Sequence, residues 1–211
     1  MIPTDIQNYI EKLASPQPTY LNELERETYQ KTVLPQMISG YYQGRLLSMF
    51  SKLTRPRQIL EIGTFTGFST LCLAEGLLPE GQIHTIDIND EFTVLQNKYF
   101  EKSPYRNQIK QYVGNAREII PRLSQQFDLI FLDADKRFYP EYFKLLVAQL
   151  NRGGLLLADN VLWYGKVAHK HIIDAETQAL RKYNELLLAD KSFEVIILPV
   201  RDGISVARKI I

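Results

Sequence analysis

The apolar positions follow two patterns along the chain, and the change comes near Pro56. Before Pro56, apolar residues recur every three or four positions, as they do on one face of a helix. They predict three helices, over residues 4–14, 19–32 and 39–53, the first two separated by a serine-proline step. Residues 1–53 are therefore expected to form a helical extension.

After Pro56, short apolar runs alternate with amphipathic stretches. The runs are predicted to be strands and span residues 58–62, 82–86, 109–113, 127–132 and 154–158. The stretches between them are predicted to be helices and span residues 67–78, 91–103, 115–124 and 140–150. Such alternation is typical of βαβ units with a parallel sheet. The runs are apolar at nearly every position, as in strands that are covered on both faces.

The C-terminal part differs from this pattern. A helix predicted over residues 174–189 is followed by two apolar runs, 193–198 and 204–210, on either side of a Pro/Asp/Gly turn. Such a turn between two strands predicts an antiparallel hairpin. We therefore expect one α/β domain over residues 1–211. Its core, residues 57–211, is expected to be a doubly wound, Rossmann-like sheet of seven strands, mostly parallel with the last strand antiparallel.

Composition and charge narrow the class of protein. With 211 residues, 45% hydrophobic and 23% charged, the chain has ordinary globular values. A net charge of +1 gives no uniform field that would attract nucleic acid or an anionic membrane. The single cysteine, Cys72, has no partner for an internal disulfide, which fits a reducing compartment. The N-terminus lacks the features of a secretory signal. We expect a cytoplasmic protein with neither nucleic-acid nor membrane partners.

The first predicted strand ends in a glycine loop. Gly63 follows the strand and Gly67 opens the next helix, where free backbone N–H groups face a ligand. Phe65 stands where the dinucleotide fingerprint needs its middle glycine, and the loop lacks the lysine of a P-loop. Glu61 would repel a polyphosphate but suits a cationic amino group. The loop therefore favours a ligand without phosphates.

The next two strand ends complete a nucleoside site. Asp87 ends the second run, where an acidic side chain accepts hydrogen bonds from both ribose hydroxyls. Residues 114–116 end the third run and are placed to line an adenine pocket. A nucleoside with an amino-acid tail and no phosphate satisfies all these features, which points to S-adenosylmethionine. The alternative is that Gly63 and Gly67 only form turns and Asp87 only caps a helix.

Oxygen-bearing side chains follow the fourth and fifth predicted strands. If these strands are neighbours, Asp133, Asp159 and Asn160 converge at one edge of the sheet. Such ligands suit a hard cation, with Mg²⁺ favoured and Mn²⁺ and Ca²⁺ as alternatives. The competing interpretation is that these residues only cap turns. Alternation along the chain points Asp135 away from Asp133, so Asp135 is predicted to be structural.

Lys136 lies three residues after Asp133. A partly desolvated lysine beside a cation gives up its proton more readily, so Lys136 is a candidate general base. The alternative is a surface lysine that pairs with Asp135.

Four segments together resemble the caffeoyl-CoA O-methyltransferase family, whose members are cation-dependent, catechol-type O-methyltransferases. The segments are residues 61–69 (EIGTFTGFS), 132–136 (LDADK), 159–163 (DNVLW) and 198–203 (LPVRDG). The resemblance runs from about Met37 to the C-terminus. It implies methyl transfer from S-adenosylmethionine to a metal-chelated hydroxyl of a catechol or caffeoyl-type molecule, and it implies a homodimer.

The resemblance also assigns residues to roles. It implies metal ligation by Asp133, Asp159 and Asn160, with Asp133 and Lys136 taking part in catalysis. The implied contacts to S-adenosylmethionine come from Ser39, Glu61, Gly63, Thr64, Ser69, Asp87, Ala116 and Asp133.

Some positions depart from the plant members of that family. Tyr164 stands where they have a substrate-contacting asparagine, and the loop over residues 165–173 is shorter, as in the compact bacterial branch. Trp163 and Tyr164 are predicted to form aromatic walls around the acceptor ring, with help from Tyr41 or Tyr42. The alternatives are a metal-independent methyltransferase with another acceptor, and a module that binds S-adenosylmethionine or a nucleoside without catalysis.

Overall fold

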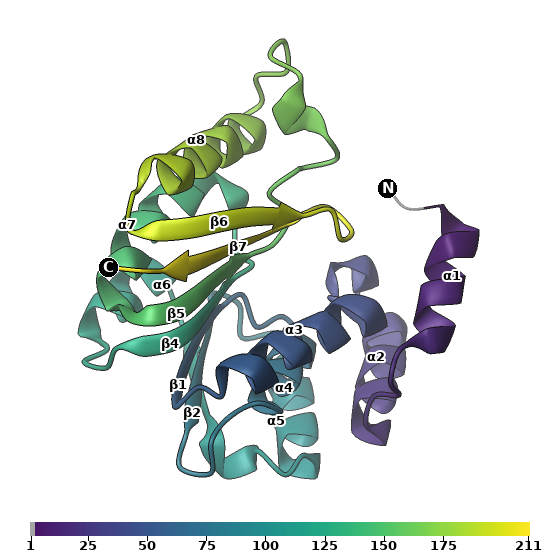
Figure 1. Ribbon diagram of the computed structural model, residues 1–211. Coiled ribbons are helices and arrows are strands. Elements are labelled where there is room, and N and C mark those ends of the chain that lie inside the picture. The colour runs from purple at the N-terminus through teal and green to yellow at the C-terminus, as the bar shows by residue number, and fades with distance from the viewer. Residues whose placement is uncertain (1–2) are drawn as a thin grey trace.

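A seven-stranded sheet forms the centre of the computed structural model, which describes residues 3–211 (Figure 1). The strand order is β3-β2-β1-β4-β5-β7-β6, and β7 runs antiparallel to both its neighbours while the other pairs are parallel. The strands are β1 Gln58–Ile62, β2 Gln82–Asp87, β3 Ile109–Val113, β4 Phe127–Leu132, β5 Leu150–Ala158, β6 Phe193–Leu198 and β7 Ile204–Lys209. The predicted fold class and the C-terminal hairpin are thereby confirmed.

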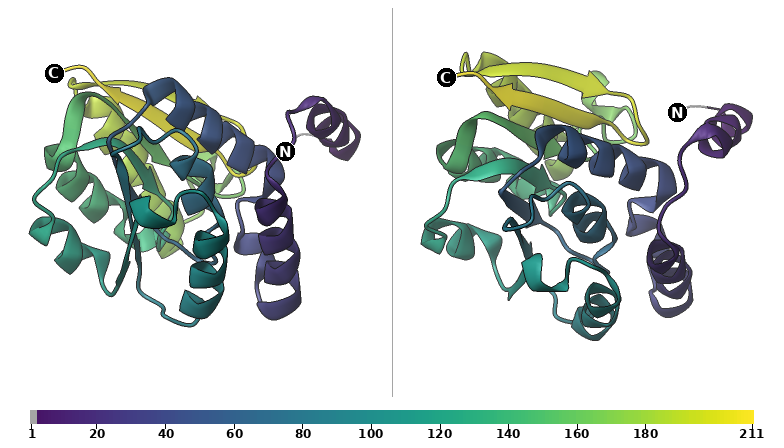
Figure 2. Two further views of the ribbon diagram at one scale, coloured as in Figure 1. Left: turned by 90° about the horizontal axis from the view of Figure 1, so that it is seen from below. Right: turned by 60° about the horizontal axis from the view of Figure 1, so that its bottom comes forward.

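Helices cover both faces of the sheet (Figures 1 and 2). One face is covered by α2, α3, α4 and α5, and the other by α6, α7 and α8. The helices are α1 Thr4–Leu13, α2 Thr19–Lys31, α3 Gly40–Thr54, α4 Phe68–Ala74, α5 Thr93–Lys102, α6 Ala116–Ile119, α7 Tyr139–Gln149 and α8 Ala175–Ala189. Short 3₁₀ turns include Pro35–Met37, Ile120–Arg122, Lys136–Phe138 and Lys166–Ala168.

The central strand β4 shows why its sequence is apolar at nearly every position. Side chains alternate across a strand, so Leu129 and Phe131 enter the core on one face while Ile130 and Leu132 enter the core on the other. All four are fully buried. A strand with one solvent-facing side would need polar residues at every second position.

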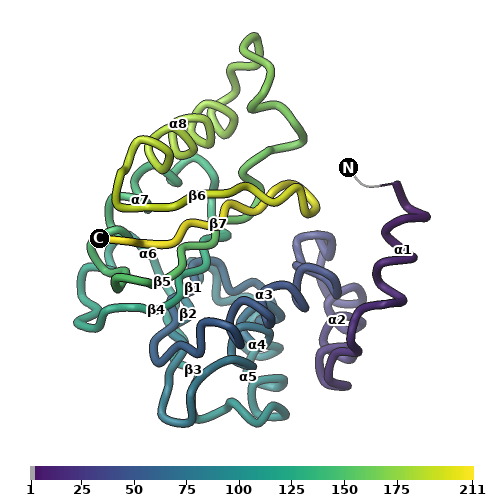
Figure 3. Tube along the Cα trace, viewed as in Figure 1, coloured from purple at the N-terminus to yellow at the C-terminus, as the bar shows by residue number. Residues whose placement is uncertain are grey.

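The N-terminal helix α1 is set apart from the rest (Figure 3). None of the residues of α1 that the structure describes is buried. The segment that follows it is held by Tyr41, whose hydroxyl lies 3.0 Å from the carbonyl oxygen of Ala14 and 2.8 Å from that of Ser15. Between residues 3 and 211, no helix has the length and apolar character needed to cross a membrane.

Three predicted elements differ from the structure by four residues or more at one end, and the others by one or two at most. The helix predicted over residues 115–124 is only α6, followed by a 3₁₀ turn, because Pro121 has no N–H to continue an α-helix. The helix predicted over residues 67–78 ends at Ala74, shortly before Gly76 and Pro79. The strand predicted from residue 154 begins at Leu150, since pairing with β4 continues through an irregular register.

Candidate functional site

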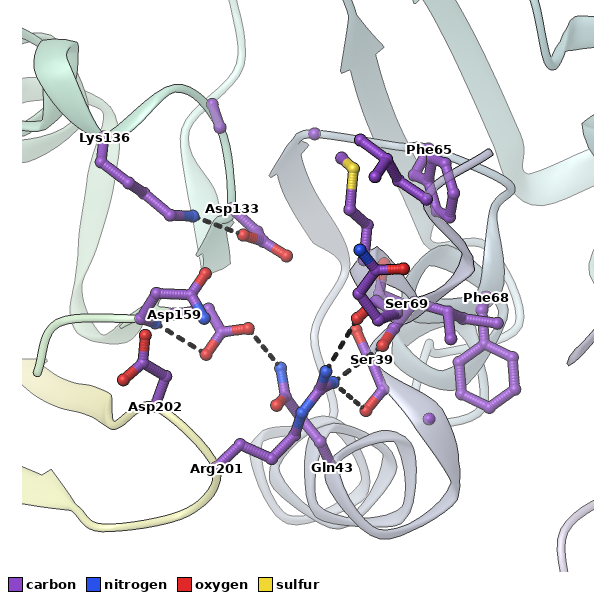
Figure 4. A pocket seen from close by; sticks show the side chains of 18 of the residues that line it. Ser39, Gln43, Phe65, Phe68, Ser69, Asp133, Lys136, Asp159, Arg201 and Asp202 are labelled. Carbon is purple, nitrogen blue, oxygen red and sulfur yellow. Dashed lines mark hydrogen bonds and ion pairs between the residues drawn. The ribbon is translucent and has the colours of Figure 1, made fainter. Parts of the chain in front are cut away.

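The carboxyl ends of β1, β2, β4 and β5 open into one cavity of about 1620 Å³. It lies where the chain order reverses, between β1 and β4, which is the usual ligand position in open α/β sheets. The cavity brings together almost all the residues singled out from the sequence. Its wall includes Ser39, Gly63, Thr64, Ser69, Asp87, Ala116, Asp133, Lys136, Asp159, Asn160, Trp163 and Tyr164. Figure 4 shows the part around Ser39, Asp133 and Asp159.

The glycine loop after β1 lies directly against the end of β4. Gly63 has φ +100°, and a Cβ placed on it would be 2.0 Å from the carbonyl oxygen of Asp133. The next two N–H groups, of Thr64 and Phe65, donate to Asp87 Oδ2 at 2.9 and 2.7 Å. Asp87 therefore fixes the loop in addition to facing the cavity, where its predicted ribose contact stays a prediction.

Glu61 is the predicted site residue that is absent from the wall. It is fully buried below the loop, where Oε2 accepts hydrogen bonds from the hydroxyls of Thr70 and Thr85. Within the described chain, Oε1 has no hydrogen-bond partner. Burial raises the pKa of Glu61 to about 7. The structure thus shows a carboxyl group beneath the cavity with one unpaired oxygen, and its predicted contact to S-adenosylmethionine stays a prediction.

The raised pKa of Glu61 predicts how stability depends on pH. Since its pKa rises from 4.5 in the unfolded chain to about 7 in the ligand-free fold, the fold holds this proton more tightly. The resulting contribution to the free energy of unfolding is complete below pH 4.5. About 3 kcal/mol of this free energy is lost as the pH rises through 7. We expect urea unfolding free energies at pH 5 and pH 8 to differ less for Glu61→Gln than for the unchanged protein. Equal differences in the two proteins would contradict this role.

The carboxylates of Asp133 and Asp159 converge at the ends of β4 and β5. These two strands are neighbours, which was the condition for this prediction. Asp159 is buried; its Oδ2 accepts from Gln43 Nε2 at 2.7 Å and its Oδ1 from the Asn160 N–H at 2.7 Å. Burial, and then the charge of Asp133, raise the pKa of Asp159 to about 6. Asn160 has φ +61°, a left-handed conformation that asparagine tolerates better than most residues.

The chemistry of this oxygen-donor set fits a hard divalent cation. Two like charges crowded in a buried place are unfavourable on their own and are relieved by a cation. No group of three or more His, Cys, Asp or Glu side chains in residues 3–211 is arranged to hold a metal. A cation at Asp133 and Asp159 would therefore also need the Asn160 amide and ligands from outside the protein.

Lys136 is buried and lies inside this cluster. Its Nζ donates to Asp133 Oδ1 at 2.7 Å and to the Tyr139 hydroxyl at 3.0 Å. The Tyr139 hydroxyl in turn donates to the Asp159 carbonyl oxygen, 2.9 Å away. Asp135 instead pairs with Arg137 and accepts from its backbone N–H. The alternative of a surface lysine paired with Asp135 is therefore wrong, and the structural role predicted for Asp135 is confirmed.

Three polar residues at the site were not singled out from the sequence. Gln43 holds Asp159, and the Arg201 guanidinium donates to the carbonyl oxygens of Ile38, at 2.8 Å, and Ser39. Asp202 accepts a hydrogen bond from the Tyr164 N–H. Figure 4 shows Arg201 and Asp202 coming from the β6–β7 turn into the site. Arg201 and Asp202 belong to the segment over residues 198–203 that carries part of the family resemblance, but no role was predicted for either residue.

Trp163 and Tyr164 both lie on the cavity wall, as the sequence analysis expected. Their ring centres are 5.5 Å apart, and Tyr164 is 74% exposed. Both residues have left-handed backbones, with φ of +46° and +55°. Such strain persists where the surroundings enforce it and is common at functional sites.

Comparisons with known proteins give one consistent family. A family model described as O-methyltransferase matches residues 11–210. The chain is 31% identical over 169 residues to a catechol O-methyltransferase of Niastella koreensis, covering 78% of this chain and 76% of that protein. It is 35% identical over 210 residues to caffeoyl-CoA O-methyltransferase 1 of Eucalyptus globulus, covering 92% and 83%.

Solved structures agree with the sequence relatives. The O-methyltransferase TomG from Streptomyces achromogenes, in complex with S-adenosylmethionine, superposes with a TM-score of 0.91 at 28% identity. The match covers 98% of this chain and 96% of that one. The similarity extends over the sheet, both helical layers and the N-terminal helices.

Proposed function

The chain belongs to the O-methyltransferase family, and on that premise we propose that it transfers a methyl group from S-adenosylmethionine to one hydroxyl of a catechol-type molecule, with the help of a divalent cation. The observation that carries this proposal is the convergence of two sets of residues on one cavity. The residues predicted to hold the methyl donor and those predicted to hold a cation all line it, except Glu61.

The donor side is built from the loop after β1 and from the end of β2. S-adenosylmethionine supplies a methyl group on a positively charged sulfur. Asp87 would accept hydrogen bonds from the ribose, and Ser39 and Ser69 line the same cavity. The unpaired Glu61 Oε1 beneath Ser69 offers negative charge to an amino group above it. Holding the donor in line with the acceptor supplies much of the catalysis in such a reaction.

The cation would be held by Asp133, Asp159 and Asn160. When bound, Mg²⁺ would act as a Lewis acid and lower the pKa of the acceptor hydroxyl. Gln43 and the Asn160 N–H fix the Asp159 carboxylate, so its position does not depend on the ligand. Such supporting contacts orient metal ligands and raise affinity.

Lys136 is the proposed base. In its neutral form, Nζ has a lone pair that accepts the proton of the attacking hydroxyl. The Tyr139 hydroxyl and Asp133 Oδ1 hold Nζ at 3.0 and 2.7 Å, so the amine is aimed at the carboxylate cluster and not into solvent. Proton transfer to a positioned group contributes about 10²–10⁴-fold to the rate of such reactions.

The acceptor ring is proposed to pack against Trp163 and Tyr164. Its two neighbouring hydroxyls would then face the carboxylates of Asp133 and Asp159. We further propose that residues 1–211 act as one catalytic unit and that two copies form a homodimer, as the resemblance implies.

The first experiment is a turnover assay with a small set of catechols and S-adenosylmethionine, in Mg²⁺ and in EDTA, with the methylated product measured by mass spectrometry. We expect product with Mg²⁺ and none with EDTA. Equal product in EDTA would favour a metal-independent methyltransferase. Binding of S-adenosylmethionine without product from any acceptor would favour a binding module.

A further inference from the structure

The charges on the cavity wall help to decide which kind of catechol the site accepts. One of the two relatives above is named for catechol and the other for caffeoyl-CoA. Among the described residues that line the cavity, nine are acidic and four are basic. A divalent cation would add two positive charges, and the methyl donor one net positive charge. The wall would still carry more negative than positive charge. The wall as a whole therefore stays acidic even in the fully assembled site.

The four basic side chains of this wall are already engaged within the protein. Their partners are Glu141 for Arg117 (2.8 Å), Asp133 for Lys136 (2.7 Å), Asp135 for Arg137, and the carbonyl oxygens of Gln36 and Ile38 for Arg201 (3.1 and 2.8 Å). Recognition of carboxylate or phosphate uses arginine or lysine donors that are free to turn toward the ligand. An anionic acceptor would have to compete with these partners for the basic side chains.

Two acidic side chains of the wall, Glu176 and Asp202, form no ion pair within residues 3–211. Glu176, in the first turn of α8, lines the cavity and has no ion-pair partner among residues 3–211. Asp202 accepts a hydrogen bond from the Tyr164 backbone N–H, and Lys136 and Arg201 are the positive charges that act on it. The basic residues of the loop after Gly165 do not neutralise these acidic side chains. Lys166 lies 3.7 Å from Asp174, and Lys170 is not part of the described wall.

We propose that the natural acceptor is a catechol without an anionic substituent, neutral or carrying an amine, and not a catechol carboxylate or a coenzyme A thioester. The inference rests on the proposed function. It does not rest on size, because a cavity of about 1620 Å³ leaves room for large acceptors. Like charges brought together at a binding site are one way in which a site rejects a ligand.

The test compares kcat/KM for acceptors of similar size: 3,4-dihydroxyphenethylamine, 4-ethylcatechol and 3,4-dihydroxyphenylpropionate, with caffeoyl-CoA as a fourth acceptor. We expect the two anionic acceptors to be poorer by about tenfold or more, and the difference to shrink at high salt. A preference for the propionate or for caffeoyl-CoA would overturn the inference and leave the proposed function standing. Methylation of none of the four would instead count against the proposed function.

A charge reversal separates electrostatics from shape. Glu176→Lys replaces an acidic side chain of the cavity wall by a cation, so the ratio of kcat/KM for the propionate over the amine should rise about tenfold. Because a ratio is measured, partial loss of folded protein cancels. The matched control is Glu185→Lys, on the same helix but exposed and off the wall, which should leave the ratio unchanged. An unchanged ratio in Glu176→Lys would overturn the inference.

Discussion

Asp159→Ala is expected to abolish cation-dependent methyl transfer while S-adenosylmethionine still binds. The substitution removes one of the two carboxylates proposed to hold the cation, at a buried position on the end of β5. A lost Lewis acid costs several kcal/mol of transition-state stabilisation, so we expect a fall in kcat of about 10³-fold. Turnover with and without Mg²⁺, and calorimetric titration with S-adenosylmethionine, measure the two effects separately.

Two further variants make this result interpretable. Asp159→Asn keeps the shape of the side chain and an oxygen that can accept from Gln43, so it should fold normally and still lose the cation-dependent activity. Asp135→Ala removes a nearby carboxylate that pairs with Arg137, and it should keep cation-dependent turnover. Full activity of Asp159→Ala in EDTA would contradict the proposed cation site.

Gly63→Ala is expected to destabilise the fold and weaken donor binding together. The new Cβ would lie 2.0 Å from the Asp133 carbonyl oxygen at a φ of +100°, so the loop after β1 and the end of β4 must separate. Overpacking and backbone strain together cost about 3–5 kcal/mol, which lowers Tm by about 10 °C in a chain of this size. Thermal unfolding and the Kd for S-adenosylmethionine test the two effects.

Gly153 provides the matched control for this substitution. It also has a left-handed backbone, with φ +83°, but a Cβ there would meet nothing within 4 Å. Gly153→Ala should therefore show only the cost of strain, about 1–2 kcal/mol, and leave donor affinity unchanged. If the two variants lost equal stability, the close approach between β1 and β4 would not be the cause.

The sheet and the placement of the site could be predicted because both depend on short-range patterns. The strands are apolar runs that end in polar residues, and parallel strands bring such ends to the same edge of a sheet. Asp133 and Asp159 were therefore predicted to meet from their positions alone. The glycines at 63 and 67 could be placed in the same way.

The contacts around these residues could not be predicted, because they join segments that are far apart in the sequence. Gln43 belongs to a helix whose apolar face gives no indication of a partner 116 residues away. Arg201 is 163 residues from Ile38, and no local pattern selects a backbone carbonyl as its acceptor. Glu61 was placed on the correct strand, but its depth below the loop depends on packing, which periodicity does not report.

The turn between β6 and β7 links the two surfaces that are proposed to contact the methyl donor and the acceptor. Arg201 holds the segment before α3 that carries Ser39, while its neighbour Asp202 holds the backbone at Tyr164. Changes at residues 162–164 that suit a new acceptor would also constrain this turn, because Asp202 holds the backbone at Tyr164. The turn cannot change freely, because the adjacent Arg201 holds the segment that carries Ser39. Positions 36–39, 162–164 and 201–202 should therefore change together among relatives, and an insertion in any one of them should require compensation in the others.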